Sequence, residues 1–215
     1  MDNKKNFVKN RLNRGTLYGI TSRKYFNCHL DSAVALINSG IELIQYREKE
    51  FSFQEMLDEV REIKKLTTRK GVILLINDHV ELCLEAACDG VHLGDEDMPV
   101  LHARKRLGAN AVIGLSTHNP GQGLAALETS ADYIGIGPMF PSANKKQYPV
   151  AGSAYAEFAA KNLPLAKVAI GGINRENLSL LLQKGIRSVC MIDGLYRSAD
   201  LKEEVKKVQE LIGLA

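Results

Sequence analysis

Short apolar runs alternate with longer amphipathic segments from Thr16 to the end of the chain. We predict strands at the eight apolar runs, which span 17–21, 41–47, 72–76, 90–93, 111–116, 133–138, 167–173 and 188–192. Their apolar residues are nearly continuous, which is typical of parallel strands that are buried on both faces. The pattern therefore predicts an α/β fold.

The segments between the apolar runs carry helix signals. Ser52 and Glu55 have the spacing of a capping box, and Asn174 marks another helix start. Asn119-Pro120 opens a helix after the fifth strand, because proline suits the first helical turn. Eight strand–helix units without a linker predict a single-domain TIM (β/α)8 barrel over residues 16–215. A doubly wound sheet also alternates strands and helices, but no GxGxxG sequence stands near the start.

Composition and charge remove several classes of protein from consideration. The chain has 215 residues, of which 45% are hydrophobic, and this is enough for one core of barrel size. Its net charge of +3 gives no reason to expect nucleic acid, and no apolar run approaches the roughly 18–20 residues that cross a membrane. We expect small-molecule partners, and an assembly of identical copies is compatible with the sequence.

Residues 1–15 form a basic and polar N-terminal extension. The segment lacks the apolar core of a secretory signal, and we expect a flexible or loosely docked tail. The four cysteines lie far apart and form no CxxC pair. Free thiols in a reducing cytosol are the simplest interpretation, which predicts a cytoplasmic protein.

Carboxylates follow two neighbouring predicted strands. Asp78 comes directly after the third strand, and Asp97 follows the fourth. In a barrel both lie at the C-terminal face, where Mg²⁺ can take one or two carboxylates and fill its other positions with water and substrate phosphate oxygens. The pair therefore predicts a magnesium site and a phosphorylated substrate. Asp95 and Glu96 are alternative ligands, and either member of the pair can instead cap a helix.

Two cations and an amide end the second predicted strand. Gln45, Arg47 and Lys49 alternate along the chain, so in an extended segment they point the same way, towards the barrel mouth. Arginine offers a fork to phosphate oxygens and lysine a compact charge. Lys145, after the sixth strand, is a candidate third cation. The alternative is that these cations pair with neighbouring surface acids such as Glu48.

Two glycines join the seventh strand to the next helix start. Gly171-Gly172 lets the backbone approach a ligand, and exposed N–H groups at a helix start favour an anion. In barrels this is a usual phosphate position, although a tight turn needs the same glycines. His92 lies inside the fourth predicted strand, where we expect a structural or supporting role.

Six motifs together resemble the thiamine phosphate synthase family over roughly residues 16–212. The motifs are Gln45-Tyr46-Arg47-Glu48-Lys49, Ile76-Asn77-Asp78, the run from Asp89 to Asp97, Gly114-Leu115-Ser116-Thr117-His118, the run from Asp132 to Pro138, and Ala169-Ile170-Gly171-Gly172-Ile173. The resemblance implies a TIM barrel transferase that joins hydroxymethylpyrimidine diphosphate to a thiazole phosphate. Pyrophosphate leaves the pyrimidine methylene with carbocation character, and the thiazole nitrogen then attacks.

The resemblance also implies roles for individual residues. Mg²⁺ would be held by Asp78 and Asp97. The groups assigned to catalysis are Arg47, Lys49, Lys145 and Ser116. The groups assigned to substrate binding are Gln45, Tyr46, Arg47, Glu48, Lys49, Asn77, Ser116, Ser142, Ala143, Asn144, Lys145, Gly172, Ile192 and Asp193. Among these, Gln45 and Ser116 would orient the aminopyrimidine, and Gly172 with Ile192-Asp193 would hold the thiazole phosphate.

The chain departs from the family pattern in two places. The loop after the sixth strand reads Pro141-Ser142-Ala143-Asn144-Lys145, where Pro-Thr-x-Thr-Lys is usual. Asp193 stands where serine is usual, and a carboxylate beside a phosphate is repulsive unless a cation or proton intervenes. Either its side chain points away and leaves its N–H to the ligand, or the acceptor differs in charge.

Two other functions compete with the synthase. A thiazole tautomerase shares the barrel but needs neither the diphosphate cations nor the carboxylate pair. A non-catalytic barrel that binds a thiamine precursor is a second alternative, and Asp193 is the residue that favours it.

Overall fold

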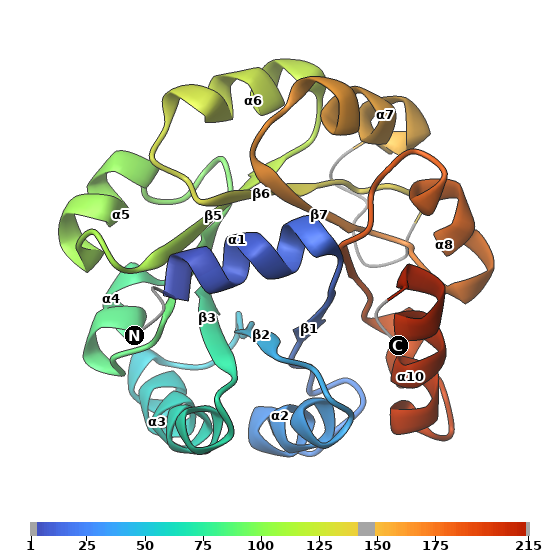
Figure 1. Ribbon diagram of the computed structural model, residues 1–215. Helices are drawn as coiled ribbons and strands as arrows, with labels where there is room; N and C mark the ends of the chain where they lie inside the picture. The colour runs from blue at the N-terminus through green and yellow to red at the C-terminus, as the bar shows by residue number, and fades with distance from the viewer. Residues whose placement is uncertain (1–3, 142–148, 214–215) are drawn as a thin grey trace.

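Eight parallel strands close into a barrel in the computed structural model, which describes residues 4–141 and 149–213 (Figure 1). The strands are β1 (Leu17–Ile20), β2 (Leu43–Tyr46), β3 (Ile73–Asn77), β4 (Gly90–Leu93), β5 (Val112–Thr117), β6 (Tyr133–Ile136), β7 (Ala166–Ile170) and β8 (Val189–Cys190). Each strand pairs with the next along the chain, and Leu17 beside Val189 closes the ring. The predicted TIM barrel is confirmed.

Helices follow the strands and form the outer ring. They are α2 (His29–Asn38), α3 (Phe53–Lys70), α4 (Val80–Glu85), α5 (Val100–Leu107), α6 (Pro120–Ala125), the 3₁₀ turn η1 (Ala126–Glu128), α7 (Gly152–Asn162), α8 (Arg175–Leu182), α9 (Asp193–Tyr196) and α10 (Leu201–Ile212). The predicted capping box at Ser52 and the predicted cap at Asn174 are confirmed, and Asn174 also forms a capping box with Asn177. The Asn119 side chain accepts the N–H of Gln122. None of the described helices is long and apolar enough to span a membrane.

Alternate strand residues build two apolar layers. Side chains such as Tyr18 and Leu75 point into the barrel, whereas Leu17 and Leu74 pack outward under the helices. Strand side chains alternate between faces, and both faces are covered here, which is why the strands read as continuous apolar runs.

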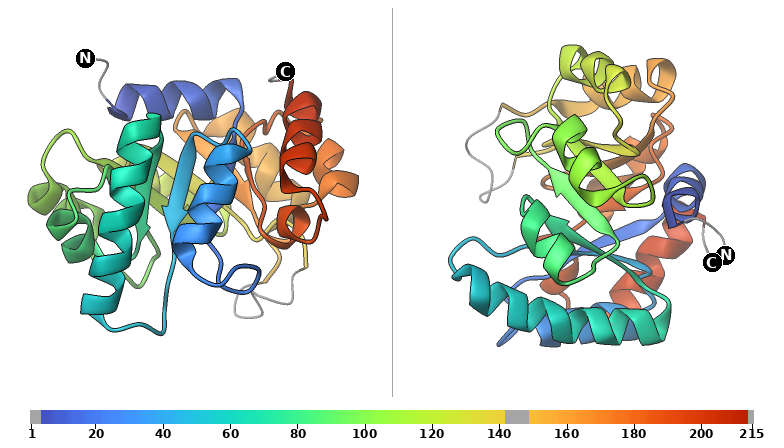
Figure 2. Two further views of the ribbon diagram at one scale, coloured as in Figure 1. Left: turned by 90° about the horizontal axis from the view of Figure 1, so that it is seen from below. Right: turned by 90° about the vertical axis from the view of Figure 1, so that its left-hand side faces the viewer.

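The N-terminal segment is a docked helix, so the expectation of a flexible or loosely docked tail was wrong. Helix α1 (Lys4–Arg14) crosses one end of the barrel, opposite the β2–α3 connection (Figure 2). Val8 and Leu12, four residues apart on one face, are buried in the same cluster as the interior strand side chains. Lys5 and Arg11 reach Asp132 and Glu42 at 3.1 and 2.7 Å. Val8 and Leu12 are the buried residues of the helix, and Phe7 packs against the same cluster while partly exposed. These few apolar positions do not give a clear amphipathic pattern in the sequence.

Candidate active site

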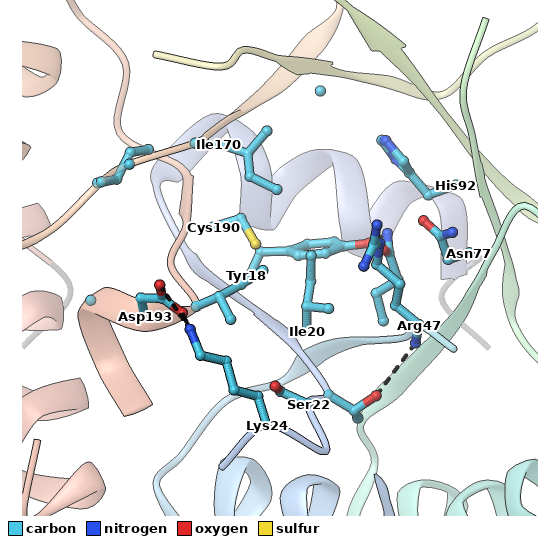
Figure 3. Close-up of a pocket in the computed structure, with 18 of the residues that line it drawn as sticks. Tyr18, Ile20, Ser22, Lys24, Arg47, Asn77, His92, Ile170, Cys190 and Asp193 are labelled. Atoms are coloured by element: carbon cyan, nitrogen blue, oxygen red, sulfur yellow. Dashed lines mark hydrogen bonds and ion pairs between the residues drawn. The ribbon is translucent and has the colours of Figure 1, made fainter. Parts of the chain in front are cut away.

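A cavity of about 1190 Å³ opens at the C-terminal ends of the strands, at the end of the barrel away from α1. Its lining includes most of the residues that the sequence singled out: Gln45, Arg47, Glu48, Lys49, Asn77, Ser116, Gly171, Gly172, Ile192 and Asp193. Figure 3 shows Arg47, Asn77 and His92 on one side of the cavity, and Lys24 with Asp193 on the other. Ser142, Ala143, Asn144 and Lys145 lie outside the described residues.

The two predicted metal ligands meet beside this cavity. Burial, followed by the nearby Asp97 carboxylate, raises the pKa of Asp78 to about 6. Lys49 Nζ lies 3.8 Å from Asp78 Oδ2, and the Gly94 N–H donates to Asp97 Oδ2 at 2.6 Å. A carboxylate whose ionisation is opposed by a neighbouring carboxylate forms with it a site that favours a cation.

The donor set at this pair fits Mg²⁺. Within residues 4–141 and 149–213, no group of three or more His, Cys, Asp and Glu side chains comes together as a metal site. Mg²⁺ is commonly bound through one or two carboxylates, with water and phosphate oxygens completing its octahedron. The Asp78–Asp97 pair therefore matches the oxygen ligands of this ion and leaves positions for a phosphorylated ligand.

The loop after β2 carries charged side chains of two kinds, some exposed at the cavity and one buried in the protein. Arg47 and Lys49 are exposed, whereas Glu48 is buried. Glu48 Oε1 accepts the N–H groups of Lys49 and Glu50 at 2.6 and 2.7 Å, and Oε2 contacts His29 Nε2 at 3.0 Å. Burial alone would raise the pKa of Glu48, but these hydrogen bonds outweigh it and hold the pKa at about 2.

These contacts give Glu48 and Tyr46 roles other than the substrate contacts expected from the motif. The Glu48 carboxylate is used to hold the loop that carries Arg47 and Lys49. Tyr46 points out of the barrel, because it follows the inward-facing Gln45 in the strand. The Tyr46 hydroxyl donates to Glu59 at 3.0 Å, and its ring is fully buried under the helices. The buried Tyr46 side chain therefore faces away from the cavity and supports the strand from outside the barrel.

A chain of hydrogen bonds crosses the barrel interior from Gln45 to Ser116. Gln45 Nε2 donates to the Tyr18 hydroxyl at 2.8 Å, and the Tyr18 and Tyr133 hydroxyls lie 3.1 Å apart. The Tyr133 hydroxyl is 2.9 Å from His92 Nδ1, and His92 Nε2 is 3.0 Å from Ser116 Oγ. Sequence reasoning missed both tyrosines, because each stands in an apolar strand where a core ring is the ordinary expectation.

The Asp193 carboxylate is surrounded by hydrogen-bond donors and cations. Lys24 Nζ lies 3.0 Å from Asp193 Oδ1, Arg197 lies 3.4 Å from Oδ2, and the Tyr25 hydroxyl donates at 2.7 Å. Burial opposes the charge, but Tyr25 and Lys24 keep the pKa of Asp193 below its ordinary value. Lys24 and Tyr25 were also missed, because nothing in the sequence links the loop after β1 to residue 193.

The two glycines after β7 are required by the packing of two loops. Gly171 and Gly172 have φ of +101° and +64°. A Cβ at Gly172 would lie 2.6 Å from the Pro141 carbonyl oxygen, and one at Gly171 would lie 2.6 Å from Pro138 Cβ. The tight-turn explanation is therefore sufficient for both glycines, although both also line the cavity.

Comparisons with known proteins identify the family of this chain. Residues 17–195 match the family described as "Thiamine monophosphate synthase". The chain is 40% identical over 200 residues to "Thiamine-phosphate synthase" of Caldicellulosiruptor bescii, covering 92% of this chain and 91% of the relative. It is 38% identical to the protein of the same name from Pelotomaculum thermopropionicum, covering 91% of each.

A solved structure is similar over nearly the whole chain. "Thiamine phosphate pyrophosphorylase" from Pyrococcus furiosus superposes with a TM-score of 0.85 at 28% identity, covering 94% of this chain and 97% of the other. The matching segment contains the eight strands, the carboxylate pair and the β2 cations. On these grounds the chain belongs to the thiamine monophosphate synthase family.

Proposed function

We propose that this protein is a Mg²⁺-dependent thiamine phosphate synthase, a transferase that joins hydroxymethylpyrimidine diphosphate to a thiazole phosphate and releases pyrophosphate. One observation carries the proposal: a carboxylate pair that favours a cation lies beside Arg47, Lys49 and Asn77, at one wall of the cavity that Gln45 and Ser116 also line. Membership of the family supports the same assignment.

The charged wall would hold the diphosphate and stabilise it as it leaves. The Arg47 fork and the Lys49 ammonium offer donors to phosphate oxygens, and Asn77 adds an amide. As the bond from the pyrimidine methylene to oxygen breaks, its electron pair goes to pyrophosphate, and prearranged cations favour that developing charge. When bound by Asp78 and Asp97, Mg²⁺ would neutralise further charge on the same leaving group.

The opposite wall would receive the thiazole phosphate. Ile192, Asp193 and Gly172 line the cavity, and by the resemblance they would hold this phosphate. The Asp193 carboxylate does not exclude a phosphate, because Lys24 supplies the intervening cation. We therefore interpret Asp193 as a tolerated variation within an ordinary acceptor site.

Turnover tests the proposal directly. The protein is mixed with both substrates and Mg²⁺, and thiamine phosphate is measured as fluorescent thiochrome, with EDTA as the control. We expect EDTA-sensitive product, and a loss of at least a hundredfold in Asp78→Asn and in Asp97→Asn, because each removes charge from the metal site. Asp95→Asn, in the same loop as Asp97, is the matched control and should keep its activity.

The same experiment separates the competing functions. Precursor binding without product from folded protein would favour the non-catalytic barrel. Full activity in both carboxylate variants would refute the metal assignment, and loss in Asp95→Asn alone would move the ligand to that residue.

All four cysteines are free thiols, which supports a reducing compartment such as the cytoplasm.

A further inference from the structure

The interior hydrogen-bond chain ends at the two residues proposed to orient the pyrimidine. Gln45 and Ser116 both line the cavity, while Tyr18 and Tyr133 between them are almost completely buried. Burial raises the pKa of both tyrosines well above the ordinary phenol value, so each carries its proton at neutral pH. Each buried hydroxyl then has one hydrogen to donate, and leaving it without an acceptor would be costly.

The first bond is compatible with a chain of donors that runs from Gln45 to Ser116. The Gln45 amide nitrogen donates to Tyr18, so the Tyr18 hydroxyl is free to donate to Tyr133. In that direction the Tyr133 hydroxyl donates to His92 Nδ1, which requires a neutral ring that carries its proton on Nε2. His92 Nε2–H would then donate to Ser116 Oγ, which lies 3.0 Å away.

Both ends of the chain thereby acquire a fixed hydrogen-bonding character. With its nitrogen engaged inside the barrel, Gln45 keeps its carbonyl oxygen as an acceptor for a ligand. The Ser116 hydroxyl accepts from His92 and keeps its own hydrogen to donate. A ligand that offers a donor to Gln45 and an acceptor to Ser116 is complementary to this pair, and an aminopyrimidine has an exocyclic amine and ring nitrogens of those kinds.

Glycines make room for the two rings at the centre of the chain. A Cβ at Gly114 would lie 2.2 Å from Tyr133 Cζ and 2.5 Å from His92 Nδ1. A Cβ at Gly135 would lie 3.0 Å from His92 Cε1. Neither glycine has a positive φ, so the backbone conformation does not demand them. Their positions are explained by the space that the Tyr133–His92 contact occupies.

We propose that Tyr18 and Tyr133 are positioning residues that fix His92 as its Nε2–H tautomer and so make the site select an amino over an oxo group on the pyrimidine ring. The proposal rests on the proposed function for the identity of the ligand. Replacing the amine by an oxo group puts an acceptor against Gln45 and a ring N–H against Ser116. To bind that ligand, every hydrogen bond from Gln45 to Ser116 would have to reverse its donor and acceptor. This reversal includes rotation of the Gln45 amide.

The tautomer is tested without substrate. In full-length protein labelled with ¹⁵N-histidine, the imidazole nitrogen shifts at neutral pH report which nitrogen carries the proton, and His92→Gln identifies the His92 signals. We expect a neutral ring protonated on Nε2. A ring protonated on Nδ1 would show that the chain runs the other way, and a doubly protonated ring would also overturn the proposal. This outcome is independent of whether the protein is a synthase.

Selectivity is tested with pyrimidine diphosphates that carry either the amino or the oxo group. We expect Tyr18→Phe and Tyr133→Phe each to lower the amino-to-oxo ratio of binding constants about tenfold, since each breaks the chain. Tyr155→Phe is the matched control, because the buried Tyr155 hydroxyl donates to Thr117 outside the chain. An unchanged ratio in both chain variants would overturn the proposal. If wild type binds neither compound, the proposed function is refuted. The tautomer experiment still tests the hydrogen-bond chain, because it needs no substrate.

Discussion

Helix α1 closes one end of the barrel, and truncating its buried leucine measures how much the barrel depends on it. Leu12 is 3% exposed and belongs to the interior apolar cluster together with Val8 and Tyr18. Leu12→Ala removes three carbons, for which the transfer term is about 2.4 kcal/mol at about 0.8 kcal/mol per methylene. The cavity left behind adds to this, and we expect the free energy of unfolding to fall by about 3 kcal/mol.

Thermal and urea unfolding provide the measurement. For a domain of this size, about 3 kcal/mol corresponds to a fall in Tm of roughly 6–12 °C. Leu101→Ala is the matched control, because Leu101 is 58% exposed on α5 and its truncation should change the free energy of unfolding by less than about 0.5 kcal/mol. Equal effects of the two substitutions would refute the conclusion that α1 is part of the barrel core.

Three further predictions concern the charged groups around the cavity. The Glu48 pKa is depressed to about 2, so its stabilisation is complete above pH 4.5 and is lost as the pH falls towards 2. The difference in unfolding free energy between wild type and Glu48→Gln should therefore shrink over that window, and a constant difference would contradict the assignment. The Asp78 pKa is raised to about 6, so below pH 6 one proton competes with Mg²⁺ for this carboxylate. The Mg²⁺ concentration for half-maximal turnover should therefore rise about tenfold for each pH unit below 6. A concentration that does not change with pH would refute the role of Asp78 as a ligand. Lys24→Ala should raise the KM for the thiazole phosphate about fivefold, because Asp193 loses its nearest cation, and adding Asp193→Ser should reverse the effect if the reasoning holds.

Much of the fold could be predicted because the strands are buried on both faces. Continuous apolar runs identified all eight strands, including β8, which is only two residues long. The capping boxes at Ser52 and Asn174 likewise depend on local spacing, which a sequence displays directly. Helix α1 was misjudged because its stability comes from burial of a few apolar side chains and from ion pairs with distant residues.

The candidate site was predictable where it follows strand ends and unpredictable where it depends on side-chain direction. Asp78 and Asp97 were predicted because each follows the C-terminal end of a strand. In the structure Asp97 is the carboxylate that lies against Asp78. The inward turn of Glu48, the outward turn of Tyr46 and the ion pair between Lys24 and Asp193 are tertiary facts. In particular, Lys24 and Asp193 are 169 positions apart in the sequence, so no local sequence pattern predicts their ion pair.

The backbone at Asp78 limits which substitutions are conservative there. Asp78 has φ of 63°, in the left-handed region that aspartate, asparagine and glycine tolerate best, and its N–H donates to the His92 carbonyl. Glutamate keeps the charge but is poorly suited to this conformation, and glycine keeps the conformation but loses the charge. Aspartate alone supplies a short carboxylate together with the required turn, so the position is constrained by chain geometry and by chemistry at the same time.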